Sequence, residues 1–110
     1  MNILNRLINK GSAPVELSVW SLTAMATGGK EVIPQAQIDT GLLPNRTISL
    51  WPYSDLTDKR VSFGRRFIIL RQDPEAVVPF KLGIPNQDGW AAYFNNNHLF
   101  IKNYRHLTEG

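Results

Sequence analysis

Residues 43–71 of this chain, LPNRTISLWPYSDLTDKRVSFGRRFIILR, carry its strongest strand pattern. Two apolar runs, at 47–51 and 67–71, are separated by a Trp-Pro-Tyr corner and a polar segment. Short runs of branched and aromatic residues bounded by Pro, Gly, Asn or Asp are typical of β-strands. The second run is apolar up to its final arginine, which predicts a strand covered on both faces of a sheet.

Turn-forming residues recur at short intervals along the whole chain. Between them lie short runs rich in Ile, Val, Leu, Trp and Phe, and no window keeps a period of 3.6 residues. This spacing predicts an all-β fold, an antiparallel sheet or β-sandwich of about seven to nine short strands. The expected strands lie at residues 3–9, 15–22, 31–34, 47–51, 67–71, 80–84, 89–94 and 99–104.

Two hairpins are expected within this set. The first two strands form one, closed by Lys10-Gly11. The last two form the other, joined through three asparagines at 95–97, because Asn tolerates the positive φ that tight hairpin turns require. A single helical turn is expected at residues 54–58, where Ser and Asp can cap backbone N–H groups. One face of the second strand holds Val15, Leu17 and Val19.

The composition is that of one small globular domain. The chain has 110 residues, 43% of them hydrophobic, so residues 1–110 are expected to form a single β domain. It has no cysteine, which excludes a disulfide framework, a thiolate metal site and a cysteine nucleophile. No signal-peptide core and no apolar run of bilayer length is present, so a cytoplasmic protein without a membrane partner is expected.

The charge balance is weakly basic, with a net charge of +3 at pH 7. The basic residues are scattered, and acidic residues interrupt the one group formed by Arg60, Arg65, Arg66 and Arg71. No nucleic-acid-binding motif is present, so nucleic acid is not the expected partner. Metal-ligand spacings and nucleotide-binding loops are also missing, so neither a metal nor a cofactor is expected.

Ten short pieces, in order and over nearly the whole chain, carry a family resemblance. They are PVEL (14–17), WSLT (20–23), GG (28–29), LLPNR (42–46), LWPYSDL (50–56), GRRF (64–67), LRQDP (70–74), PFKLG (79–83), GWAAYF (89–94) and LFIK (99–102). On these pieces the chain resembles a branch of the galactose-mutarotase-like, or aldose-epimerase-like, β-supersandwich proteins. Those proteins are considerably longer, so the resemblance implies a central slice of a supersandwich fold.

The resemblance implies sugar handling. Mutarotation needs a general acid at the ring oxygen and a general base at the anomeric hydroxyl. In the family a histidine and a carboxylate near the C-terminal end fill these roles, and His98, His106 and Glu109 do not lie in matching motifs. No catalytic residue is therefore assigned, and an epimerase would need a neighbouring subunit to supply them. The leading hypothesis is a non-catalytic module that binds a carbohydrate or another small ligand.

Three aromatic residues are candidate ligand contacts, because aromatic faces stack on the apolar faces of sugar rings. Trp51 and Tyr53 flank a proline at a strand end, and the alternative is that Trp51 is core and Tyr53 a corner residue. Trp90 is the third candidate. It lies three positions before Tyr93 in one strand, on the opposite face, so at most one of the two lines a given pocket.

Two basic residues complete the candidate set. Arg71 ends an apolar strand, and its guanidinium can make paired hydrogen bonds to hydroxyls or carboxylates. Lys102 sits among apolar residues of the last strand and points either into a cleft or to solvent. The alternative for Arg71 is an ion pair with Asp55, Asp58 or Asp73.

The expected macromolecular partner is a second copy of the chain. A slice of a larger sandwich exposes sheet surface and strand edges, which a symmetric homodimer can bury. The alternative function follows from the same surface: a structural or interaction protein in which the sheet face is an oligomer interface and no small ligand binds.

Overall fold

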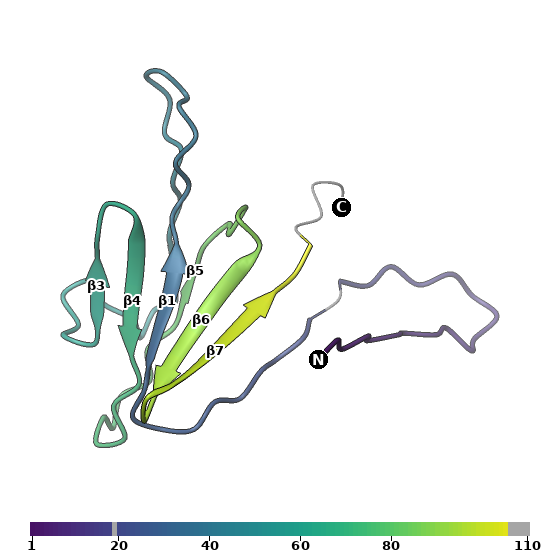
Figure 1. Ribbon diagram of the computed structural model, residues 1–110. Coiled ribbons are helices and arrows are strands. Elements are labelled where there is room, and N and C mark those ends of the chain that lie inside the picture. The colour runs from purple at the N-terminus through teal and green to yellow at the C-terminus, as the bar shows by residue number, and fades with distance from the viewer. Residues whose placement is uncertain (19, 106–110) are drawn as a thin grey trace.

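The computed structural model describes residues 1–18 and 20–105 (Figure 1). Its seven strands form two antiparallel sheets, so the predicted all-β class is confirmed. The larger sheet has five strands in the order β3-β4-β1-β6-β7, and the smaller sheet pairs β2 with β5. The strands are β1 (Lys30–Pro34), β2 (Ser49–Leu50), β3 (Val61–Phe63), β4 (Phe67–Arg71), β5 (Leu82–Gly83), β6 (Trp90–Asn95) and β7 (His98–Asn103). No helix in the described ranges is long and apolar enough to cross a membrane.

Four strands form within one residue of their predicted bounds: β1, β4, β6 and β7. The branched residues of β1 and β4 lie opposite one another, Val32 with Ile69 and Ile33 with Ile68. Between β6 and β7 the turn consists of Asn96 and Asn97, at φ 47° and 59°. This is the left-handed backbone that a two-residue hairpin turn requires, so the predicted hairpin is confirmed.

The segment between β2 and β4 differs from expectation. Residues 54–58 form turns instead of a helical turn, with Ser54 N–H donating to Trp51 and Asp58 N–H to Asp55. Strand β3 was not predicted, because three residues are too few for a recognisable alternation. Strands β2 and β5 are two residues long, and prolines at 52, 79 and 85, which cannot donate to a ladder, lie close to their ends.

The predicted hairpin of residues 3–9 and 15–22 does not form, so that prediction is wrong; Val19 lies outside the described residues. Its turn is present, since the Asn9 side chain accepts from Gly11 N–H and donates to Ala13 O, each at 2.8 Å. The flanking residues run as extended chain away from the sheets (Figure 1). A two-stranded hairpin without a third layer is marginal in water, and the described residues of this one are all exposed.

The five-stranded sheet is covered on one face only. In β4, Ile68 is fully buried, whereas Phe67 and Ile69 on the other face are each 37% exposed. The smaller sheet packs on the Ile68 side, where Ile84, just after β5, lines a small cavity together with Ile68. The prediction that β4 is covered on both faces is therefore wrong. We call the bare side the open face; its register positions hold Val32, Phe67, Ile69, Arg71, Trp90, Phe94, Leu99 and Ile101.

Candidate functional site

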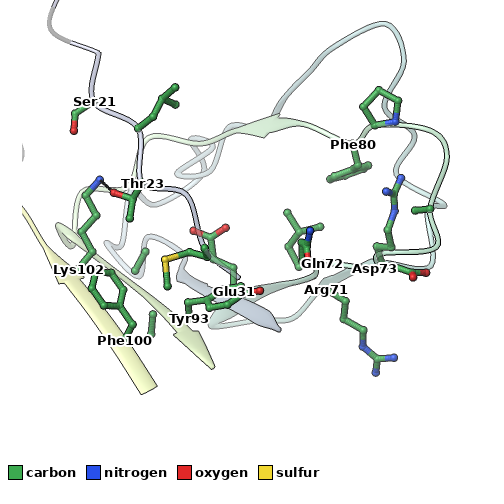
Figure 2. Close-up of a pocket in the computed structure, with 18 of the residues that line it drawn as sticks. Ser21, Thr23, Glu31, Arg71, Gln72, Asp73, Phe80, Tyr93, Phe100 and Lys102 are labelled. Carbon is green, nitrogen blue, oxygen red and sulfur yellow. Dashed lines mark hydrogen bonds between the residues drawn. The ribbon is translucent and has the colours of Figure 1, made fainter. Parts of the chain in front are cut away.

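A cleft of about 540 Å³ lies on the covered face of the five-stranded sheet. Its floor crosses four strands. One row of paired residues lines it: Leu70 of β4, Glu31 of β1, Tyr93 of β6 and Phe100 of β7. Residues 21–25 form one wall, and the chain between β4 and β5 forms the wall that carries Asp73 and Phe80 (Figure 2). Small-molecule sites occupy about 300–1,000 Å³, so the cleft has the volume of such a site.

Glu31 and Lys102 supply the charge on the cleft floor. Glu31 lies on the central strand, and burial raises the pKa of its carboxyl above the ordinary 4.5. The positive charge of Lys102, which projects from β7 on the same face, opposes that rise. The Glu31 carboxylate is thus partly desolvated, and the charge that stabilises it is that of Lys102. A hydrogen-bond donor on a ligand in the cleft would stabilise the carboxylate further.

Tyr93 holds the first wall in place. Its hydroxyl donates to the Ala26 carbonyl and accepts from Gly29 N–H at 2.9 Å. Asn95 Nδ2 donates to the Thr27 carbonyl at 3.0 Å, and Lys102 Nζ donates to Thr23 Oγ1 at 3.0 Å. Residues 23–27 therefore run beside β7, with Thr27 near the hairpin turn and Thr23 near the far end of the strand. Thr23 and Met25 line the cleft.

Arg60 braces the opposite wall. Its guanidinium forms an ion pair with Asp58 at 2.7 Å and lies 5.8 Å from the centre of the Phe80 ring. The hydrogen bonds from Arg60 hold the pKa of the Asp58 carboxyl below its usual value. Because Arg60 is already paired, Lys102 is the cation best placed to meet a ligand at the floor.

Trp51 and Tyr53 lie outside the cleft, at the two-stranded sheet. The Trp51 ring covers Gly83 of β5, and Lys81 Nζ lies 4.0 Å above the ring centre. Trp51 is 36% exposed and Tyr53 46% exposed. Neither residue is among those that line the cleft.

Arg71 and Trp90 lie on the open face, on the other side of the five-stranded sheet. Trp90 packs edge-on against Phe67, with ring centres 6.2 Å apart. Arg71 sits opposite Lys30, and Figure 2 shows its guanidinium directed away from the cleft. Among the described residues the ion pair of this region joins Asp58 to Arg60 and leaves Arg71 out. Arg71 and Lys102 are the two of the five candidate contacts that line the cleft. The Arg71 guanidinium is directed away from it, so Lys102 is the candidate whose charged group faces the cleft.

Glu31 is the cleft residue that sequence reasoning missed. It is a single carboxylate inside the run Lys-Glu-Val-Ile-Pro. Alternation along this run shows which residues share a face but not which face is buried. Its assignment to the covered face depends on pairing with Leu70 and Tyr93, which lie far away in sequence. A carboxylate directly before the apolar residues of a short strand was the available signal. His98 lies at the hairpin turn with Nδ1 2.8 Å from the Asn96 carbonyl, and His106 and Glu109 lie outside the described residues.

Comparison with known proteins adds no relative to this picture. No family model matches the chain, and neither a curated protein nor a solved structure does. The resemblance to the mutarotase-like proteins therefore stays a prediction, and the function is argued from the cleft itself.

Proposed function

We propose that this chain is a ligand-binding domain whose cleft takes a small polyhydroxylated molecule of the carbohydrate class. The supporting observation is the joint placement of a buried carboxyl, an ammonium group and aromatic rings around one cavity of about 540 Å³. The proposal keeps the binding role expected from the sequence. It replaces the predicted set of aromatic and basic contacts by the cleft on the covered face, to which Lys102 contributes its charged group.

The chemistry of the cleft matches that of a sugar. Sugar hydroxyls both donate and accept, so they can donate to the Glu31 carboxylate and accept from Lys102 Nζ. The C–H faces of a sugar ring are apolar, and Phe80 and Phe100 line the same cavity. Strands β1 and β7 are separated by β6, which puts the two charged residues on strands about 10 Å apart. A single monosaccharide would bridge them.

Ligand-observed NMR tests this proposal. Saturation-transfer spectra are recorded for D-galactose, D-glucose and D-glucuronate with the unmodified protein, Glu31→Gln and Lys102→Met. At least one sugar should give a signal with the unmodified protein. Each substitution should weaken binding of that sugar roughly tenfold or more, because it removes a charged hydrogen-bonding group from a partly buried site.

The matched control is Lys30→Gln, which removes a charge from the open face of the same sheet at a position that does not line the cleft. Its sugar signals should equal those of the unmodified protein. Equal binding by all four proteins would contradict the assignment of the cleft, and loss of binding in Lys30→Gln alone would place the ligand on the open face. The same samples report on catalysis, since an epimerase would equilibrate the anomers of a hexose faster than buffer does.

A further inference from the structure

Residues 1–18, which we call the arm, carry apolar side chains that are exposed in the described part of the chain. Val15 and Leu17 are 57% and 70% exposed, and they alternate with Glu16 and Ser18. This alternation is that of a half-buried strand, yet no residue of the arm belongs to a strand. The arm is a strand-forming segment that lacks a neighbour.

No strand among residues 1–18 and 20–105 pairs with the outer edge of β7. Among the described residues β7 is the last strand of its sheet and is six residues long, whereas the other edge strand, β3, has three residues. The two-residue turn makes Asn95 and His98 a hydrogen-bonded pair, and Tyr104 N–H bonds Gly89 O at 2.8 Å in the same register. The backbone groups of Leu99, Ile101 and Asn103 therefore point outward, free to pair.

We propose that residues 14–18 of one copy of this chain add as a strand to the β7 edge of a second copy, so that two copies exchange arms and form a symmetric dimer. Backbone hydrogen bonds would join the arm to the outward groups of β7, as in other cases of strand addition. Val15 and Leu17 would then continue one face of the sheet beside Leu99 and Ile101. Pro14 stands at the first position of the added strand, where a missing N–H is tolerated.

The path of residues 20–27 indicates that the arm pairs with β7 of a second copy and not with β7 of its own chain. Thr27 is hydrogen-bonded to Asn95 beside the hairpin turn, and Thr23 to Lys102 near the C-terminal end of β7. Followed from residue 27 back to residue 23, the chain therefore runs along β7 and leaves it at the C-terminal end of the strand. Trp20 then lies near Lys81, the residue before β5, with the Lys81 ammonium 5.8 Å from the centre of its ring. To pair with its own β7 the chain would have to reverse between residues 20 and 22, which include no Gly, Pro or Asn. Figure 1 shows the arm leading away from the sheets.

The area available approaches that of a specific interface when each side chain at the contact is counted as fully buried, which gives an upper bound. Burial of a Val or Leu side chain removes roughly 60–120 Å² from water, and each exchanged arm brings Val15 and Leu17 against Leu99 and Ile101. Two arms therefore remove about 500–1,000 Å² by side chains alone. The paired backbones add to this, which brings the total near the roughly 1,200–2,000 Å² of a specific protein interface.

Cross-linking with engineered cysteines tests the contact, because the chain has no cysteine of its own. Leu17→Cys and Ile101→Cys proteins are mixed, allowed to exchange and treated with a short bis-maleimide reagent. A covalent heterodimer is expected. The control replaces Leu17→Cys with Val77→Cys, which is 95% exposed in the loop between β4 and β5 and should give no heterodimer.

Light scattering over a dilution series completes the test and separates the arm from the open face. The unmodified protein and the control Leu4→Asp should be dimers, and Leu17→Asp should have half their mass. Ile69→Lys, which places a charge on the open face away from β7, should remain a dimer. A monomeric unmodified protein, a dimer that resists Leu17→Asp, or a dimer that Ile69→Lys alone dissociates would overturn the proposal. None of these readouts depends on a ligand, so they are independent of the proposed binding function.

Discussion

Glu31 shows at the scale of one residue how the cleft affects stability. Burial raises its folded-state pKa above 4.5, so the folded protein holds this proton more tightly than the unfolded chain. The free energy of unfolding therefore falls as pH rises from about 4.5 through the folded-state pKa. Glu31→Gln removes this titration, so its stability relative to the unmodified protein should increase over that interval. Urea unfolding at a series of pH values measures the difference.

Lys102→Met gives the companion test for this residue pair. The ammonium of Lys102 opposes the rise in the pKa of Glu31, so its removal should make the loss of stability with pH larger. A stability difference between Glu31→Gln and the unmodified protein that stays constant with pH would contradict the burial of the Glu31 carboxyl.

Gly29 is a second residue whose identity is dictated by its surroundings. A Cβ at this position would overlap the Tyr93 ring, whose hydroxyl fixes the cleft wall. Gly29→Ala should therefore lower the free energy of unfolding by about 1–3 kcal/mol, the usual cost of overpacking. Gly11→Ala is the control, because a Cβ there meets only the Asn9 side chain of the exposed arm, and its effect should stay within about 0.5 kcal/mol. Equal unfolding midpoints for the two variants would show that Tyr93 does not pack on Gly29.

The β6–β7 hairpin is the element whose sequence and structure agree most closely. Asn97 has φ 59°, a left-handed conformation that costs a β-branched residue about 1–2 kcal/mol. Asn97→Val should destabilise the protein by that amount, and Asn97→Gly should leave it unchanged or slightly more stable. Asn103→Val at the end of β7 is the control, with an expected change within about 0.5 kcal/mol. Thermal unfolding compares the three, and a neutral Asn97→Val would contradict the turn.

The same element explains why one predicted hairpin forms and the other does not. Both have a turn in place, closed by the Asn9 side chain in one case and formed by the left-handed residues Asn96 and Asn97 in the other. Strand β6 gains a second neighbour in β1, whereas the residues around Asn9 have no third strand beside them. Local pattern therefore predicted the turns, and long-range pairing decided which turn is followed by a sheet.

At the scale of the whole molecule, the sequence predicted the strand class and most long strands but not which faces meet. Strand order places β1 between β4 and β6, so neighbours in the sheet are far apart in the chain. A shift of one residue in register moves a side chain to the other face. This is why Arg71, Trp90 and Lys102 were grouped as one site, and why the structure sends the first two to the open face and the third to the cleft.

The division into sheets and arm predicts where a protease cuts first. Arg6 and Lys10 lie in extended, exposed chain, whereas Lys30, Arg71 and Lys102 lie in paired strands. Brief trypsin treatment should therefore cut in the arm before the strands, because cleavage of a paired strand requires unfolding. Gly29→Ala should speed the later cuts and leave the rate of the first unchanged, as mass spectrometry of timed samples will show. A first cut within a strand, or an arm cut that accelerates in Gly29→Ala, would mean that the arm belongs to the cooperatively folded unit.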